Sequence, residues 1–226
     1  MRDVLIEADS ISRSYRQGGA PVAAVASATF RVRAGDRVAL VGRSGSGKST
    51  LLHLMAGLDV PSGGVIRWPA LGPPETLLPA KIALVFQAPS LLEPMTVSEN
   101  VALPLLLAKI GGDVDAAVSA ALATFGLEDL ARKLPEELSG GQMQRVAMAR
   151  AIVGSPSVIL ADEPTGQLDQ PTGHALLEAL LDHLAGSTTA LVIATHDVSI
   201  AERMEVIWRI ERGVLLASTE AREVPA

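Results

Sequence analysis

Two hydrophobic patterns alternate along most of the chain. Short apolar runs lie at residues 38–41, 82–86, 158–161 and 190–194, and longer amphipathic segments separate them. Runs that do not alternate with polar residues predict strands that are buried on both faces. Strands that alternate with helices predict a mainly parallel sheet with crossover helices. The pattern therefore predicts an α/β fold.

The first part of the chain departs from this pattern. Residues 5–14 and 28–32 partly alternate between apolar and polar positions, and Gly18 and Gly19 lie between them. Partial alternation on both sides of a glycine turn is typical of an antiparallel pair with one face exposed. We predict an antiparallel β subdomain at the edge of the main sheet, with its turn at Gly18 and Gly19.

The middle of the chain is helical in pattern. Strand signals are absent from about residue 89 to residue 156, and residues 116–125 and 142–153 have helical periodicity. We predict one domain over residues 1–226. Its core, together with the antiparallel strands, takes residues 1–88 and 157–226, and an α-helical subdomain of residues 89–156 is inserted.

Composition narrows the classes of function. Lys+Arg number 19 against 25 Asp+Glu, which gives a net charge of -6 and no basic surface of the kind that binds nucleic acid. The chain has no cysteine, so disulfides and thiolate metal sites are excluded, as suits a reducing compartment. No apolar run approaches the roughly 20 residues that a membrane-spanning helix needs, so we expect the chain not to enter a membrane alone. The most apolar segment outside the strands, residues 101–110, predicts either a buried core helix or a docking surface.

The motif GRSGSGKST follows the apolar strand RVALV and precedes the helical segment LLHLMAGL. Its glycines allow a tight turn whose N–H groups point at phosphate oxygens, and the following helix adds its positive end. We expect Lys48 to reach the β- and γ-phosphates and the Ser49 hydroxyl to bind Mg²⁺. The predicted ATP-binding loop consists of Gly42, Arg43, Ser44, Gly45, Ser46, Gly47, Lys48, Ser49 and Thr50.

A second motif, VILADEP, places two carboxylates at the end of a buried strand. Phosphoryl transfer needs a carboxylate for Mg²⁺ and a group that positions the attacking water. Asp162 is suited to the metal and Glu163 to the activation of water.

The class of enzyme is indicated by LSGGQMQRVAMARA at residues 138–151. A Ser-Gly-Gly turn that opens a helix is a second anion-binding device. The motif resembles the signature of the ABC ATPase family, and this resemblance covers nearly the whole chain. It implies a P-loop NTPase core and a homodimer on ATP binding. In that dimer, Ser139, Gly140, Gly141 and Gln142 of one subunit close over the ATP that is held by the other subunit.

Further positions match the same family in order. By resemblance, Tyr15 stacks on adenine, and Gln87 contacts Mg²⁺ and the attacking water close to a transmembrane partner. Asp169 crosses the dimer interface, and His196 holds the γ-phosphate. His53, His174 and His183 have no such match and are predicted to be ordinary helix residues.

The resemblance implies an ATPase whose catalytic residues are Glu163, His196, Lys48 and Gln87, with Mg²⁺ held by Ser49, Gln87 and Asp162. It also implies a separate transmembrane permease that docks near Gln87 and the helical subdomain, on the cytoplasmic face of a bacterial cell membrane. No nucleic acid partner is expected.

Three segments, LLHLMAGLDVPSGG, TVSENVALPLLL and TGQLDQPTG, look like the branch for lipoprotein release, macrolide export and cell division. The branch usually has Asn at position 167 instead of Gln, Gln at 143 instead of Met, and a helix where residues 68–81 are rich in proline. The end at Ala226, without a further regulatory domain, favours an exporter or a mechanical transmitter.

An ATP-driven signalling partner of a membrane protein, without transport, is the alternative. A chromosome-organising ATPase would need a long heptad insertion, and a translation ATPase would need two such domains. Neither feature is present in the sequence.

Overall fold

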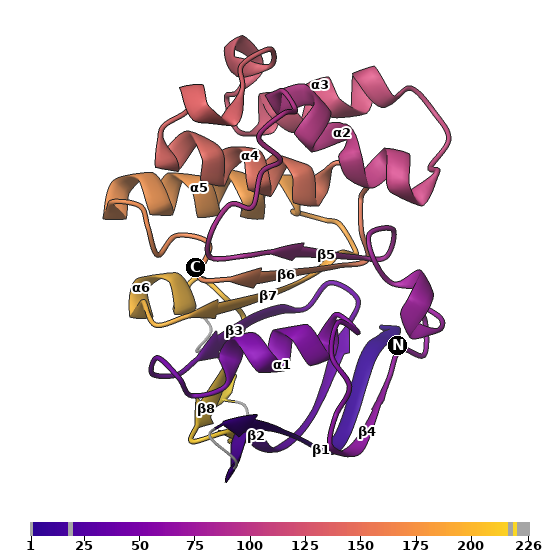
Figure 1. The fold of residues 1–226 in the computed structure, drawn as a ribbon, viewed down its shortest axis with the longest axis vertical. Coiled ribbons are helices and arrows are strands. Elements are labelled where there is room, and N and C mark those ends of the chain that lie inside the picture. The colour runs from indigo at the N-terminus through magenta and orange to yellow at the C-terminus, as the bar shows by residue number, and fades with distance from the viewer. Residues whose placement is uncertain (1, 18–19, 217–218, 221–226) are drawn as a thin grey trace.

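The computed structural model describes residues 2–17, 20–216 and 219–220 (Figure 1). In this part of the chain ten strands form one sheet, in the order β4-β1-β2-β9-β8-β3-β7-β6-β5, with β10 beside β8. The central strands are parallel, and they are β3 (Arg37–Val41), β5 (Ile82–Val85), β6 (Val158–Asp162), β7 (Ala190–Thr195) and β8 (Val206–Glu211). The predicted α/β fold with a mainly parallel sheet is confirmed.

The other strands lie beyond β8 in the sheet or pair with it, outside the parallel group. They are β1 (Val4–Gln17), β2 (Ala20–Arg33), β4 (Gly63–Arg67), β9 (Val214–Leu215) and β10 (Thr219–Glu220). Strands β1 and β2 pair antiparallel, as predicted, but each extends over 14 residues. Their register shifts at several points, and these irregularities explain why the alternation in the sequence is only partial. The predicted turn at Gly18 and Gly19 lies outside the described residues.

The helices are α1 (Lys48–Met55), α2 (Val97–Ala108), α3 (Val114–Thr124), α4 (Gly140–Ile152), α5 (Gln170–His183) and α6 (Val198–Ala201), with short 3₁₀ turns at Pro74–Thr76, Glu128–Leu130 and Pro135–Glu137. Helices α3 and α4 each begin two residues before the predicted start, because Asp113 and Ser139 cap their first turns. None of the described residues between β5 and β6 forms a strand, in agreement with the predicted helical insertion.

The parallel strands separate two hydrophobic cores. Alternate residues of β3 point to opposite faces, so that Ala39 packs with α2, α4 and α5, while Val38 and Leu40 pack with α1. Figure 1 shows α2 to α5 on one side of β5, β6 and β7, and α1 on the other side. The phosphate-loop helix and the signature helix of one chain therefore lie on opposite faces of its sheet.

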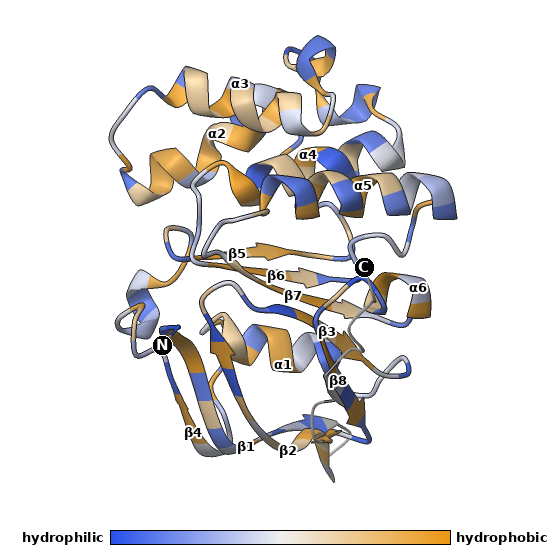
Figure 2. Ribbon diagram, turned by 180° about the vertical axis from the view of Figure 1, so that it is seen from behind, coloured by the Kyte–Doolittle hydropathy of each residue, from blue (hydrophilic) through white to orange (hydrophobic). Residues whose placement is uncertain are grey.

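Helix α2 contains most of the apolar segment at residues 101–110, and the predicted core helix is confirmed for part of it, while the docking surface stays a prediction. Val101 and Leu105 are buried in the core, whereas Leu106 and Leu107 are 57% and 64% exposed. Figure 2 shows α2 as one of the most hydrophobic helices of the molecule. Among the helices that the structure describes, none has both the length and the apolar character to span a membrane.

Asn100 ties α2 to the loop before it. Its buried amide donates to the carbonyl oxygens of Leu92, Met95 and Thr96 and accepts from the Leu92 N–H. Asn100→Ala would leave several of these groups without partners in a site closed to water, so we expect it to lower the free energy of unfolding by about 2–4 kcal/mol. Urea denaturation measures the effect, with Ser119→Ala on the exposed face of α3 as the control. A loss of less than about 0.5 kcal/mol would contradict this role.

Candidate functional site

The loop between β3 and α1 folds tightly against neighbouring strands. Gly47 has a φ of 106°, and a Cβ at this position would overlap the carbonyl oxygen of Ala24 in β2. At Gly42 a Cβ would overlap the carbonyl oxygen of Ile210 in β8. Only glycine fits at either position, since any side chain would push the loop away from its supports.

The turn between β8 and β9 supports the same loop. The Gly213 N–H donates to the Ser46 carbonyl oxygen at 3.0 Å, and the Gly213 carbonyl oxygen accepts from Ala26 and Ser27 of β2. These bonds join the phosphate loop to the antiparallel strands through one residue. Gly213 was not predicted from the sequence, since a lone glycine after a strand has no distinctive spacing.

The start of α1 is suited to bind an anion. Its first turn contains no acidic residue, its N-cap Gly47 offers no side chain to the exposed N–H groups, and Lys48 and Ser49 are its first two residues. Unpaired N–H groups and the helix dipole favour negative charge at this end. The loop geometry therefore fits a phosphate group.

Glu163 lies between the Lys48 ammonium group and the His196 ring. Its Oε1 is 3.2 Å from the Lys48 Nζ and its Oε2 is 2.9 Å from the His196 Nδ1, while Lys48 also donates to the Gly42 carbonyl oxygen at 2.9 Å. The three residues follow β6, β3 and β7, which are neighbours in the sheet with parallel carboxyl ends. The Lys48 side chain is 5% exposed and that of His196 is 63% exposed. The trio thus runs from the buried phosphate loop to the surface.

The backbone at Glu163 is unusual for a residue with a side chain. Its φ is 45°, in the left-handed region, and its N–H donates to the Ala194 carbonyl oxygen at 2.9 Å. Such a conformation costs about 1–2 kcal/mol. It turns the chain sharply after β6 and directs Glu163 towards Lys48.

The residues predicted to bind Mg²⁺ provide oxygen atoms. Asp162 is the half-buried last residue of β6, Ser49 is exposed in the first turn of α1, and Gln87 is exposed after β5. Hydroxyl, carboxylate and amide oxygens are the ligands that suit Mg²⁺. No group of three or more His, Asp or Glu residues in the described chain could hold a metal alone. The donor set fits a cation whose remaining ligands are phosphate oxygens and water.

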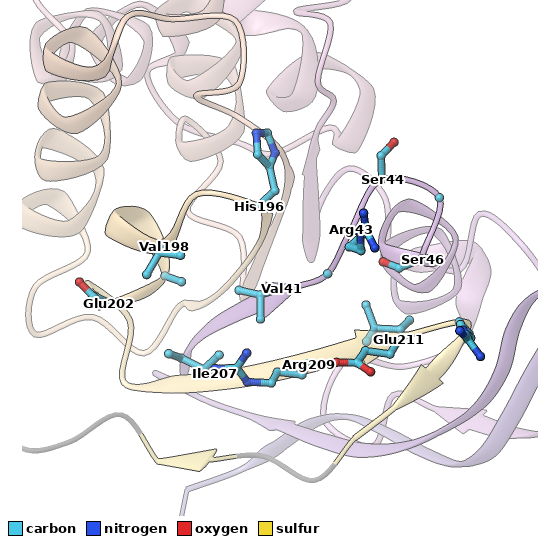
Figure 3. Close-up of a pocket in the computed structure, with 15 residues that line it drawn as sticks. Val41, Arg43, Ser44, Ser46, His196, Val198, Glu202, Ile207, Arg209 and Glu211 are labelled. Atoms are coloured by element: carbon cyan, nitrogen blue, oxygen red, sulfur yellow. The ribbon is translucent and has the colours of Figure 1, made fainter.

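A cavity of about 990 Å³ adjoins the phosphate loop (Figure 3). It is bounded by residues 42–46 of the loop, by His196, by α6 and by β8. Figure 3 shows Arg43 and Ser46 on the loop side and Arg209 and Glu211 along β8. Lys48 and Glu163 do not line the cavity, so the cavity extends beyond the cluster of Lys48, Glu163 and His196.

The signature residues lie at the start of α4. The Ser139 hydroxyl accepts from the Gln142 N–H at 3.2 Å, and the Gln142 side chain accepts from the Ser139 N–H at 2.8 Å. A hydroxyl that accepts one bond still has a proton to donate. Among the described residues no hydrogen bond joins this turn, including Gly140 and Gly141, to the trio of Lys48, Glu163 and His196.

Asp169 caps α5. Its carboxylate accepts from the Thr172 N–H at 3.0 Å and from the Thr172 hydroxyl at 2.9 Å, and these two bonds hold the pKa of Asp169 below its usual value. The predicted interface residue thus keeps its charge and fixes the start of the helix.

Of the three histidines predicted to be ordinary, all lie in helices, but His174 has a specific contact. Its Nε2 lies 2.8 Å from the Ser199 hydroxyl, which donates to Asp197 at 2.7 Å. Asp197 directly follows His196, so α5 is linked to the segment that carries this histidine. This network is not recognisable in the sequence because its members lie on different elements.

Tyr15 lies near the end of β1 and is 41% exposed. Its hydroxyl donates to the Asp59 Oδ2 at 2.6 Å, and the Arg13 guanidinium lies 4.8 Å from the centre of its ring. Arg13 and Asp59 were not identified from the sequence, since their pairing joins residues 46 positions apart.

Comparisons with known proteins agree with this geometry. Residues 25–166 match the family model described as ABC transporter. The chain is 40% identical over 225 residues to the lipoprotein-releasing system ATP-binding protein LolD of Legionella pneumophila, covering 96% of this chain and 99% of that one. It is 41% identical to LolD of Chromohalobacter salexigens over 223 residues, covering 94% and 93%.

Solved structures show the same fold. The dimeric, post-hydrolysis structure of the ATP-binding cassette MJ0796 bound to ADP and Pi superposes with a TM-score of 0.88 at 31% identity, covering 96% of this chain and 99% of that one. CbiO1 of Clostridium perfringens, part of the transporter complex cbiONQ, superposes with a TM-score of 0.82 at 26% identity, covering 98% and 90%. By its sequence, its fold and its phosphate loop, the chain belongs to the ABC transporter family.

Proposed function

We propose that this chain is the ATP-hydrolysing subunit of an ABC transporter and that it drives a separate permease in the release of lipoproteins or of a chemically similar lipid-linked cargo. The chain is an ATPase of the ABC family that uses ATP and Mg²⁺. The placement of Glu163 between Lys48 and His196, at the end of the phosphate loop, is the observation that carries the proposal. The cargo class is supported by the likeness to LolD over nearly the full length of both chains.

The loop residues Gly42 to Thr50 bind the phosphates of ATP. Their N–H groups and the start of α1 offset the negative charge, while Lys48 turns its ammonium group towards the β- and γ-phosphates. Ser49 and Asp162, with Gln87, would hold Mg²⁺, which would neutralise part of the charge of the phosphate oxygens. Tyr15 contacts the base.

Glu163 positions and activates the water that attacks the γ-phosphorus. Its carboxylate accepts a hydrogen bond from that water and so holds the water oxygen in line with the bond that breaks. The carboxylate takes the proton of the water as the new bond to phosphorus forms. His196 turns from Glu163 towards the γ-phosphate and donates to it. Lys48 and His196 together offset the charge that shifts onto the leaving oxygen.

The signature completes the site from a second subunit. Helices α1 and α4 pack on opposite faces of one sheet, and this separation supports a site that forms between two chains. The structures of MJ0796 are dimeric. The Ser139 hydroxyl and the N–H groups of Gly140 and Gly141, with Gln142, then face the γ-phosphate of the partner, and Asp169 crosses the interface.

The permease docks on the apolar groove beside α2. This groove has a volume of about 260 Å³ and includes Leu58, Phe86, Leu103, Pro104 and Leu107. Phe86 in this groove directly precedes Gln87, so a movement of Gln87 at the nucleotide would reach the bound partner. An exposed apolar groove of this kind suits a short helix that presents an apolar face. The subunit thus sits at the cytoplasmic face of the bacterial membrane through its partner.

The docking proposal is tested by Leu107→Glu. A charge at this exposed site in the groove would have to be buried without a partner, so we expect the affinity for the permease subunits to fall about tenfold or more. Co-purification from membranes that contain both components measures the loss. The control is Val65→Glu on β4, which is also exposed. Undiminished co-purification of the Leu107 variant would place the permease elsewhere.

A further inference from the structure

The ring of Tyr15 is held on two sides by a pair of charged residues. Arg13 binds Asp59 through two parallel bonds, from Nε to Oδ2 at 2.8 Å and from Nη2 to Oδ1 at 2.6 Å. The same Oδ2 accepts the Tyr15 hydroxyl at 2.6 Å, and the Arg13 guanidinium lies over the Tyr15 ring at 4.8 Å from its centre. One carboxylate thus anchors both the guanidinium and the phenol.

Arg13, Tyr15 and Asp59 come from two separate parts of the chain. Arg13 and Tyr15 are two positions apart on β1, so both side chains lie on the same face of that strand. Asp59 lies in the loop that follows α1, the helix whose first residues are Lys48 and Ser49. The cluster therefore connects the strand that carries Tyr15 to the helix that binds phosphate.

Asp59 and Arg13 both stay ionised in this cluster. Burial alone would raise the pKa of Asp59, but bonds from the Tyr15 hydroxyl, the Val60 N–H and Arg13 outweigh it and hold the pKa below its usual value. The Tyr15 hydroxyl and Asp59 in turn raise the pKa of Arg13. The carboxylate and the guanidinium thus stay ionised at any physiological pH.

We propose that Arg13 and Asp59 are positioning residues for base recognition, which hold the Tyr15 ring so that its uncovered face stacks on the base of ATP. This inference rests on the proposed function, in which Tyr15 contacts the base. Arg13 covers one face of the ring, so the exposed area lies on the other face and the edges. A ring already fixed at its hydroxyl and at one face loses little freedom when a base stacks on it, and binding is tighter for that reason.

The test compares a ligand that has a base with one that has none. MgATP and magnesium tripolyphosphate both engage the phosphate loop, but only MgATP engages Tyr15. We expect Arg13→Gln to raise the Kd for MgATP about three- to tenfold and to leave the Kd for tripolyphosphate unchanged, whereas Tyr15→Ala raises the Kd for MgATP about five- to hundredfold, as expected for the loss of one base stack. Arg13→Lys, which keeps a cation near the ring, recovers part of the affinity.

Two further variants make the inference falsifiable. In the double variant, Arg13→Gln should add nothing to Tyr15→Ala, because Arg13 acts through the ring. Arg31→Gln removes a comparable ion pair between β1 and β2, the one with Glu7, and should leave both Kd values unchanged. Calorimetry provides all the Kd values, and thermal unfolding confirms that each variant is folded.

Three results would overturn the inference. They are an equal loss of affinity for tripolyphosphate in Arg13→Gln, an unchanged Kd for MgATP in that variant, and fully additive effects in the double variant. An unchanged Kd for MgATP in Tyr15→Ala would instead remove the base contact from the proposed function and the inference with it. Mg²⁺-dependent hydrolysis that is lost on changing Glu163 would still establish the ATPase in that case.

Discussion

Replacing Glu163 with Gln is expected to lower the turnover of ATP by about 10²- to 10⁴-fold, the range that the loss of a general base causes. The amide keeps the size of the side chain and can still accept from Lys48, but it cannot take a proton from water. ATP should remain bound, since the phosphate contacts come from the loop and from Lys48. Retained ATP should also hold two subunits together.

This result is measured as phosphate release at saturating MgATP, with ATP binding by equilibrium dialysis and the mass of the complex by light scattering. Glu178→Gln is a matched control, because Glu178 lies on α5 in an exposed pair with Arg203. Full hydrolysis by the Glu163 variant would show that another group activates the water.

Mixing two inactive variants is expected to restore activity. Lys48→Ala removes the ammonium from the phosphate loop, and Ser139→Glu places a carboxylate where the partner's γ-phosphate would lie, so that neither homodimer has an intact site. A mixed dimer has one site in which both the loop and the signature are unaltered. Random pairing of equal amounts then gives about one quarter of the sites of the wild type.

The measurement is hydrolysis as a function of mixing ratio, which should peak at equal amounts of the two variants. The control mixes Lys48→Ala with Glu163→Gln. Both changes lie on the loop side of the site, so each mixed dimer has one site without Lys48 and one without Glu163, and no activity should return. If the first mixture is also inactive, the loop and the signature act within one chain.

Much of the site could be predicted from the sequence because its residues follow strand ends in continuous motifs. Lys48 after β3, Glu163 after β6 and His196 after β7 meet because these strands are parallel neighbours. The order of the strands, however, depends on pairing between distant segments. Strand β8, whose Trp208 and Ile210 are buried in alternation with exposed residues, was not predicted although its pattern is visible.

Other features depend on tertiary contacts. The links from Asp59 to Arg13 and from His174 to Ser199 join residues on different elements, and neither has a spacing that a single sequence makes recognisable. The apolar segment around Leu105 illustrates the same limit. Its composition could not show that Leu105 faces the core while Leu106 and Leu107 face outwards, since this depends on where the neighbouring helices pack.

The position of β8 and β9 has a consequence for synthesis on the ribosome. These strands lie near the end of the chain in sequence but between β2 and β3 in the sheet, and Gly213 joins the antiparallel strands to the phosphate loop. Until β8 and β9 leave the ribosome, no strand connects β2 to β3 within the sheet. The phosphate loop also lacks the hydrogen bond that the Gly213 N–H donates to the Ser46 carbonyl oxygen. A nascent chain would therefore emerge with its nucleotide site incomplete, and ATP would bind only after β8 and β9 have left the ribosome.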